Sequence, residues 1–201
     1  MTPPRMQAIL ECVDGGRVLD VGAAGNAVTI DDEHWLHRKL DRRAEEVVAV
    51  DTDHEGVTEM RARGYEAIHG DAQALVVVDG PFDVVVAAEV IEHLGDPGAL
   101  FDAAADVLAP RGRLLVSTPN MWAVVYLRRA LTGGVPADPA HTCWFDRETL
   151  LTLAQRRGFD GEVEYVRPEA GGLSALVYRL GVERLGGTRL VGEFSFGGEQ
   201  A

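Results

Sequence analysis

Two carboxylates and an imidazole stand close together at Glu89, Glu92 and His93, directly after an apolar, valine-rich run. Spacings of three and four residues from Glu89 place all three on nearly one face if the segment is helical. Mixed oxygen and nitrogen ligands suit magnesium, manganese or zinc, and a metal held there can polarise a substrate hydroxyl. The alternative is that Glu92 and His93 serve packing or substrate contact.

Without a metal, His93 or His141 is the candidate general base. An imidazole can accept a hydroxyl proton near neutral pH. The alternative for each is a hydrogen-bonded structural histidine. We favour that structural role for the other four histidines, which we expect on exposed helix faces or at strand ends: His34, His37, His54 and His69.

A glycine turn at residues 17–26 is the element around which these groups must be positioned. A short apolar strand runs into Gly22 and Gly25, where the absence of a Cβ lets a ligand approach the backbone. The small Ala23 and Ala24 keep that surface open. Two glycines three apart are common, so the prediction of a nucleotide-sized site also depends on the segments that follow.

Apolar strands at residues 47–50, 65–69 and 82–88 alternate with helical segments, which predicts a doubly wound α/β fold with ligands at the carboxyl ends of parallel strands. Asp51 ends the second strand, where a carboxylate can accept hydrogen bonds from both ribose hydroxyls. Asp71 follows the third strand, in position to meet an adenine amino group.

Five segments in this order resemble class I S-adenosylmethionine-dependent methyltransferases: residues 18–25, Asp51, residues 70–72, residues 82–94 and residues 108–120. The resemblance covers residues 17 to about 167. It implies a Rossmann-like seven-stranded sheet that is mostly parallel, with the last strand antiparallel and helices on both faces. The NAD alternative is weaker, because the order Gly-x-Gly-x-x-Gly is absent.

The resemblance also implies a cofactor site. The glycine turn would hold the methionine part, Asp51 the ribose, and Asp71 with Ala72 the adenine, while Glu89 borders the sulfonium. The full implied set is Asp20, Gly22, Ala23, Ala24, Gly25, Asp51, Thr52, Asp71, Ala72 and Glu89. The chain has Gly22, Ala24 and Asn26 where many members have three glycines. Ala24 therefore adds a methyl group at the expected ligand surface, and Asn26 is expected to cap a helix or to tolerate a positive φ.

The order Glu-x-x-Glu-His resembles metal-assisted members, including ubiquinone-biosynthesis O-methyltransferases and small-RNA 2′-O-methyltransferases. The RNA enzymes add a later histidine, which makes His141 the candidate fourth ligand beside Glu89, Glu92 and His93. The same order also occurs in members where Glu89 only borders the cofactor.

The expected substrate side is an insertion at residues 121–141, which would form a lid. Its helix at 121–131 carries Trp122, Tyr126 and an Arg128-Arg129 pair, which together are candidates to line a site for an apolar or anionic acceptor. For Trp122 and Tyr126 a place in the core is equally expected. Beyond it we expect a His-x-x-x-Phe loop, a helix at 147–157 capped by Asp146, a strand at 159–167, a helix at 174–185 and a strand at 189–196.

The bulk properties limit the classes of function. The length of 201 residues predicts a single domain (1–201). We expect Cys12 and Cys143 to be free thiols. We also expect no membrane span and a cytoplasmic monomer or homodimer. A net charge of −13, with one lysine among 19 basic residues, disfavours nucleic acid and suggests adaptation to salt. We expect methyl transfer to a small-molecule acceptor at oxygen. The alternatives are a non-catalytic cofactor-binding module and a metal-assisted enzyme acting on RNA ends.

Overall fold

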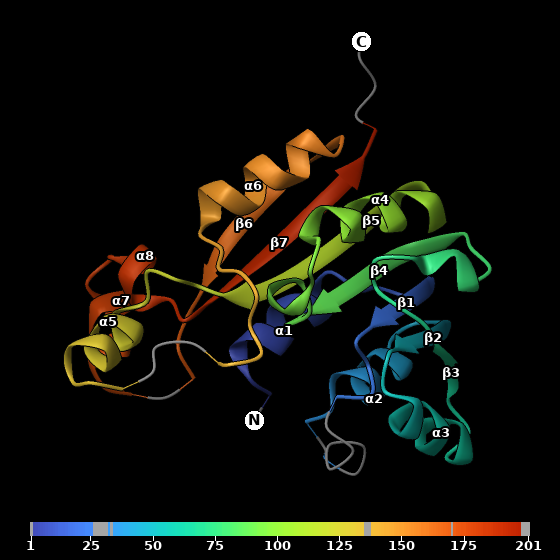
Figure 1. Cartoon of the computed structure of the whole chain (residues 1–201), viewed down its shortest axis with the longest axis horizontal. Coiled ribbons are helices and arrows are strands. Elements are labelled where there is room, and N and C mark those ends of the chain that lie inside the picture. The colour runs from blue at the N-terminus through green and yellow to red at the C-terminus, as the bar shows by residue number, and fades with distance from the viewer. Residues whose placement is uncertain (1, 26–31, 33, 135–137, 170, 198–201) are drawn as a thin grey trace.

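A seven-stranded sheet forms the centre of the computed structural model, which describes residues 2–25, 32, 34–134, 138–169 and 171–197 (Figure 1). The strand order is β3-β2-β1-β4-β5-β7-β6, and only β7 is antiparallel to its neighbours. The strands are β1 (Arg17–Val21), β2 (Glu46–Asp51), β3 (Glu66–His69), β4 (Phe82–Ala88), β5 (Leu108–Pro119), β6 (Phe159–Val166) and β7 (Arg189–Phe196). The expected Rossmann-like fold with an antiparallel last strand is confirmed.

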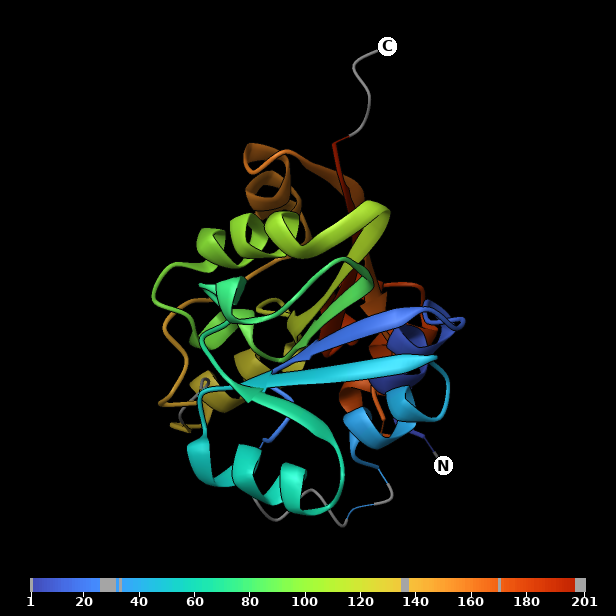
Figure 2. The same cartoon turned by 90° about the vertical axis from the view of Figure 1, so that its right-hand side faces the viewer.

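Helices cover both faces of this sheet (Figure 2). One face carries α1 (Pro4–Glu11), α2 (Leu36–Asp41) and α3 (His54–Ala62); the other carries the short turn η2 (Leu75–Val77), α4 (Pro97–Val107) and α6 (Arg147–Arg156). A third group gathers at one end of the sheet: α5 (Val124–Leu131), α7 (Leu173–Arg179) and α8 (Glu183–Gly186). None of the described helices combines the length and the apolar character that crossing a bilayer requires.

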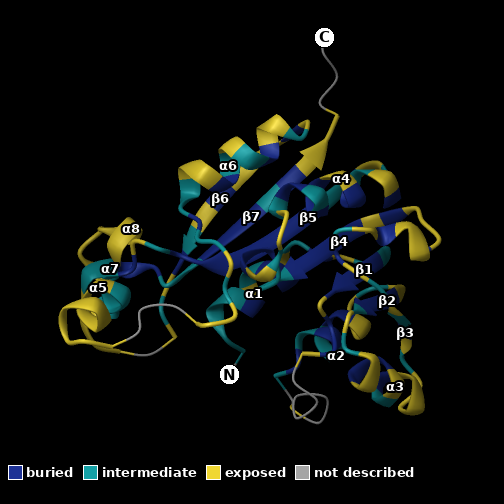
Figure 3. Cartoon of the chain, viewed as in Figure 1, coloured by how far each residue is buried: buried dark blue, intermediate teal, exposed yellow. Residues whose placement is uncertain are grey.

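Alternation along the central strands explains the two layers. Leu19 and Val21 pack into the core beneath α4 and α6, whereas Val18 between them packs into the core beneath α1. The register pairs Leu19 with Val48 on one side and with Val85 on the other, and all three are buried. This central layer is dark blue in Figure 3, and the end formed by α5, α7 and α8 is largely teal and yellow. The expected site thus lies at the edge of a rigid core.

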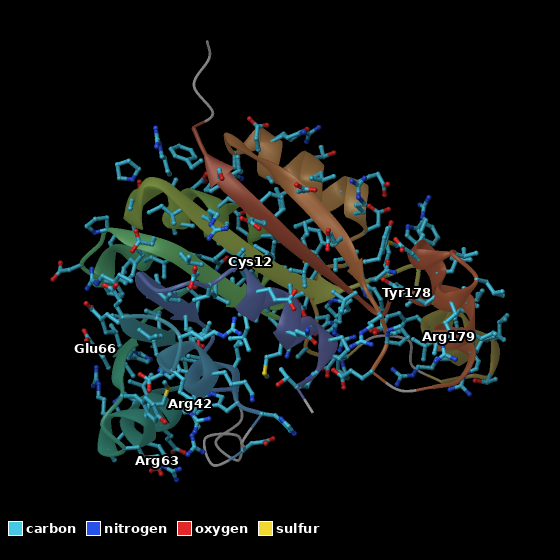
Figure 4. All side chains as sticks on the ribbon, turned by 180° about the vertical axis from the view of Figure 1, so that it is seen from behind. Cys12, Arg42, Arg63, Glu66, Tyr178 and Arg179 are labelled. Carbon is cyan, nitrogen blue, oxygen red and sulfur yellow. The ribbon has the colours of Figure 1, made fainter. Side chains whose placement is uncertain are left out.

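The last third of the chain follows the predicted elements closely. Asp146 caps α6 by accepting a hydrogen bond from the backbone N–H of Thr149, and Gly158 ends it with a φ of +80°. The helix expected at 174–185 is wrong as a single element. It divides into α7 and α8 at Gly181, whose φ of +80° interrupts the helix. Tyr178 and Arg179 mark α7 in Figure 4, at the end of the molecule opposite Arg63.

Other local predictions need correction. The apolar spacing at residues 29–43 predicts a helix there, with Asp31 or Asp32 as its cap. Within the described residues, α2 begins at Leu36, and the Asp32 carboxylate accepts from the N–H of His34 in the preceding turn. Asp31, like Asn26, lies outside the described residues. His37 is fully buried and not on an exposed helix face, because it packs between Trp35 and Tyr65 and bonds to a buried carboxylate.

Candidate active site

Three adjoining cavities lie along the carboxyl ends of the central parallel strands. The first, of about 280 Å³, is lined by five of the predicted cofactor residues together with Val21, Val50, Gly70, Gln73, Val90, His93, Leu94 and Gly95. The five predicted residues are Gly22, Asp51, Thr52, Asp71 and Ala72. Residues 22 and 72 are 50 positions apart, and only the parallel order of β1, β2 and β3 brings them together.

Gly22 is the residue that the turn requires. Its φ is +77°, a conformation that residues with a side chain rarely adopt. A Cβ built there would lie 2.5 Å from Cγ2 of Val90, so a side chain would displace the wall of the cavity. The Gly22 N–H donates to the carbonyl of Val50 at 2.8 Å and thus fixes the turn to β2.

Asp51 holds the same turn from the other side. One carboxylate oxygen accepts from the N–H of Ala24 at 2.9 Å, and the other accepts from the N–H of Asp53 at 2.8 Å. Each oxygen has a second lone pair that remains available to a ligand hydroxyl. Asp53, not Asp51, caps α3, because its side chain accepts from the N–H of Glu55. Asp51 therefore combines a structural role with a free acceptor face.

The second cavity, of about 190 Å³, adjoins the first at Gly22. It is lined by the predicted Asp20, Ala23 and Gly25, and by Arg5 from α1, which the sequence patterns did not indicate. Asp20 is 3% exposed and pairs with Nδ1 of His37 at 3.0 Å, so one of its oxygens faces the histidine. The cavity combines one guanidinium with carboxylates, as a zwitterionic ligand end requires.

Two predicted cofactor residues are also held by contacts within the protein. Ala24 is fully buried, and its methyl group packs beside Gly56 of α3, so the expectation that it adds a methyl group at the ligand surface is wrong. The Ala-for-Gly change is accommodated because that side of the turn faces the core. Asp71 is exposed, and its Oδ1 accepts from the backbone N–H of Gln73 at 2.9 Å, while the side-chain amide of Gln73 lies 3.3 Å from both carboxylate oxygens.

The third cavity, of about 430 Å³, contains the whole proposed carboxylate-histidine set. Its walls include Glu89, Glu92, His93 and His141. The other residues that line it are Pro119, Tyr126, Arg129, Asp138, Pro139, Trp144 and Arg189. Tyr126 lines this cavity, whereas Trp122 is 43% exposed and donates from its indole to Asp146 at 2.9 Å. His93 belongs to the walls of both the first and the third cavity.

His141 reaches this site through the residue that follows it. The N–H and the hydroxyl of Thr142 both donate to the carbonyl of Glu92, at 2.8 and 3.1 Å, and the hydroxyl lies 2.6 Å from the carbonyl of Leu94. These bonds attach the segment before α6 to the short turn η3 (Ile91–His93). The rings of His93 and His141 therefore meet at 4.7 Å between centroids. No spacing in the sequence relates Thr142 to Glu92, so the sequence patterns did not predict this attachment.

Three of the four proposed metal ligands come together. Ligand atoms of Glu92, His93 and His141 all lie within 4.8 Å of one another. Glu89 stands apart, because the segment is not the helix that we expected: Glu89 has a φ of +59°, and η3 begins only at Ile91. Its carboxylate instead accepts from Arg189 at 2.5 Å and from Ser117 at 3.2 Å. Arg189, from the last strand, was not predicted as a site residue.

The two histidines differ in their environments. Nδ1 of His93 lies 3.2 Å from the carbonyl of Ala140, so a proton on Nδ1 leaves Nε2 as an acceptor or a ligand. Burial, followed by the nearby charge of His93, lowers the pKa of His141 below its usual 6.5. His141 is therefore neutral at pH 7, the form that can accept a proton or bind a metal.

Glu92 is the most perturbed carboxylate of the site. It is 2% exposed, and burial, followed by the charge of Glu89, raises its pKa from 4.5 to about 7. The hydroxyl of Thr118 donates to it at 3.0 Å and partly offsets this effect. A buried carboxylate beside two imidazoles is a group that a bound cation would stabilise in its charged form.

This raised pKa makes the stability of the metal-free protein depend on pH. Between pH 4.5 and 7 the folded state keeps the proton on Glu92, whereas the unfolded state loses it. The stabilisation that this proton gives the folded state is therefore present at low pH and is lost as the pH rises through 7. We expect Glu92→Gln to gain about 2 kcal/mol in unfolding free energy relative to the wild type between pH 5.5 and 8.5. Denaturant titrations of both proteins in EDTA measure the two unfolding free energies. A difference between the two proteins that stays constant over this pH range would contradict the raised pKa of Glu92.

A family profile described as a methyltransferase domain matches residues 3–163. The chain belongs to this family of methyltransferases. The ubiquinone biosynthesis O-methyltransferase of Xylella fastidiosa (strain 9a5c) is 36% identical over 129 residues, which are 60% of this chain and 49% of the relative. The chain thus spans about half the length of the curated relatives it matches.

Solved structures share the methyltransferase fold at low identity. The N-methyltransferase NodS of Bradyrhizobium japonicum, in complex with S-adenosyl-L-homocysteine, has a TM-score of 0.58 and 19% identity, with 94% of this chain and 84% of NodS covered. An S-adenosylmethionine-dependent methyltransferase of Mesorhizobium loti has a TM-score of 0.61 and 21% identity, with 95% of each chain covered. These matches show that the chain shares the fold of these methyltransferases.

Proposed function

We propose that this methyltransferase transfers a methyl group from S-adenosylmethionine to an oxygen atom of a small-molecule acceptor. The proposal rests on one observation: His93 lines both the cavity of Asp51 and Asp71 and the cavity of His141, so these two cavities adjoin. The name of the Xylella fastidiosa relative supports oxygen as the acceptor atom. The net charge of −13 disfavours a polyanionic substrate such as RNA.

The residues of the first two cavities fit the cofactor. Asp51 offers paired oxygens to the ribose hydroxyls, and Asp71 with Ala72 borders the adenine. In the second cavity, Arg5 is suited to the methionine carboxylate and Asp20 to the ammonium group. A Cβ at Gly22 would intrude here, which accounts for glycine at the junction of the two cavities.

The third cavity supplies alignment and proton transfer. S-adenosylmethionine, when bound, provides an electrophilic methyl group that needs little activation. The protein must therefore hold the acceptor oxygen in line and remove its proton. Neutral His141 accepts the proton, and His93, oriented by the carbonyl of Ala140, lies at the boundary between the two cavities. Tyr126 and Trp144, whose rings are 5.0 Å apart, form an aromatic wall for the acceptor.

Methyl transfer is tested with radiolabelled S-adenosylmethionine and a panel of phenols, catechols and fractionated metabolite extract. We expect label to pass to a hydroxylated small molecule. Label on amines alone would contradict transfer to oxygen. Binding of S-adenosylhomocysteine in calorimetry without any transfer would favour the alternative of a non-catalytic cofactor-binding module.

A metal-assisted mechanism is the second candidate, favoured by the grouping of Glu92, His93 and His141 within 4.8 Å. One carboxylate and two imidazoles fit magnesium, manganese or zinc, and a metal there would polarise the acceptor hydroxyl. Titration of the metal-free protein with Mn²⁺, followed by calorimetry, tests the site. Binding that is lost in both His93→Ala and His141→Ala would support it, and equal binding in these variants would contradict it.

We also propose that the protein is adapted to concentrated salt. Acidic residues number 32 against 19 basic ones, and their mutual repulsion weakens as salt screens it. The melting temperature should rise by several degrees between 0.1 and 2 M KCl. A melting temperature that falls over this range in differential scanning fluorimetry would contradict the proposal.

A further inference from the structure

A fourth cavity, of about 540 Å³, lies beside the acceptor cavity and has no role in cofactor binding or proton transfer. It lies between α5, the connection between β6 and α7, and the start of β7, and it is open to solvent. Its lining is Val125, Tyr126, Arg128, Arg129, Pro168, Glu169, Gly171, Gly172, Leu173, Ser174, Thr188 and Arg189. Tyr126, Arg129 and Arg189 also line the acceptor cavity, so the two spaces adjoin along these three side chains.

Two arginines of α5 belong to the walls of this cavity. Val125 and Tyr126 line it as well and are half-buried, whereas Arg128 and Arg129 are exposed. Leu127 and Leu131 are exposed too and line neither of the two spaces. The cavity is open to solvent and presents two guanidinium groups to a ligand that enters it.

The two arginines are not neutralised by the protein. Among the described residues, neither Arg128 nor Arg129 forms an ion pair with a carboxylate, although acidic residues outnumber basic ones by 13 in the whole chain. The Arg129 guanidinium lies over the Tyr126 ring at 5.9 Å. Arg189, in contrast, is neutralised by Glu89 at 2.5 Å. The only carboxylate in the described lining of the cavity is that of Glu169.

We propose that the acceptor is an anion, and that Arg128 and Arg129 bind its carboxylate or phosphate group in this cavity while its nucleophilic oxygen lies beside His141. Guanidinium groups bind both anions through paired N–H donors, and the hydroxyls of Ser174 and Thr188 in the same walls add polar partners. This inference rests on the proposed function and specifies its substrate class. The Tyr126 ring, shared by both cavities, contacts the portion of the acceptor that connects its two ends.

Small probes test the subsite directly. Benzoate and phenyl phosphate, and their neutral counterparts benzamide and phenol, are titrated into ¹⁵N-labelled protein saturated with S-adenosylhomocysteine, at fixed ionic strength. We expect the anions to bind at least fivefold more tightly than the neutral compounds and to shift the amide signals of residues 125–129 and 171–174. The tighter of the two anions identifies the acceptor group as a carboxylate or a phosphate.

Variants separate local binding from general electrostatics. Arg128→Gln with Arg129→Gln should weaken anion binding about tenfold. The matched control, Arg42→Gln with Arg179→Gln, removes the same charge at two exposed positions that do not line the cavity and should leave binding unchanged (Figure 4). Equal affinity for neutral and charged probes, anion binding retained by the first variant, or an equal loss in the control would each overturn the proposal. Calorimetry with S-adenosylhomocysteine separates this failure from failure of the proposed function, because cofactor affinity should be the same in all three proteins.

Discussion

Asp51→Asn is expected to weaken the binding of S-adenosylhomocysteine about 100-fold. An asparagine keeps the size of the side chain and one acceptor, but it places an N–H₂ donor where the carboxylate has a second acceptor oxygen. That group would then face either the N–H of Ala24 or the N–H of Asp53, both of which are donors. Loss of a charge-assisted hydrogen bond together with an unpaired donor costs about 3 kcal/mol. Calorimetry at pH 7.5 gives the two affinities.

The neighbouring acid provides the control for this experiment. Asp53 lies two residues further along and caps α3, but it does not line the cofactor cavity. Asp53→Asn should leave the affinity for S-adenosylhomocysteine within about twofold, because asparagine is itself a good cap. Thermal denaturation shows whether Asp51→Asn remains folded. Unchanged affinity in folded Asp51→Asn would remove this residue from the cofactor site.

His141→Ala is expected to lower turnover about 1000-fold while the affinity for S-adenosylhomocysteine stays the same. His141 lines the acceptor cavity and not the cavity of Asp51, so its loss removes the proton acceptor without removing a cofactor contact. Because its pKa is lowered by burial, wild-type turnover should fall only below pH 6.5. His141→Ala should lose this acidic limb. Turnover of the acceptor found in the transfer assay is measured from pH 5 to 9.

Chelation decides which role His141 performs. If His141 acts as the base, wild-type turnover should survive EDTA. If it is a metal ligand, EDTA should abolish turnover and Mn²⁺ should restore it. His54→Ala serves as the control, because His54 is exposed on α3, its ring contacts the ring of His69, and it lines neither the cofactor cavity nor the acceptor cavity. Wild-type turnover in His141→Ala would show that this histidine is structural.

Most of the fold could be predicted because its signals are local. The strands at 82–88 and 189–196 have the predicted bounds, since valine-rich and alternating segments between turn residues specify strands with little help from the rest of the chain. The same patterns failed where tertiary contacts dominate. A charged histidine-containing segment predicts an exposed face, yet His37 is buried because Asp20, 17 residues earlier, provides its partner.

The candidate site could be predicted only as far as strand ends determine it. Gly22, Asp51 and Asp71 meet because parallel strands end at one edge of the sheet, which periodicity reveals. Arg5 and Arg189 come from the first helix and the last strand, and no spacing in the sequence relates them to Glu89. Glu89 does not join the expected cluster, because its positive φ directs its side chain toward those arginines. A glutamate rarely adopts a positive φ, so its residue type did not predict this conformation.

The shared position of His93 has a consequence for the order in which ligands bind. Its ring is part of the wall on both sides, so a ligand on either side that moves the ring reshapes the other binding space. Thermodynamic linkage then requires two factors to be equal: the factor by which bound cofactor changes the affinity for the acceptor, and the factor by which bound acceptor changes the affinity for the cofactor. A movement of this one side chain would then couple the binding of the acceptor to the release of the spent cofactor.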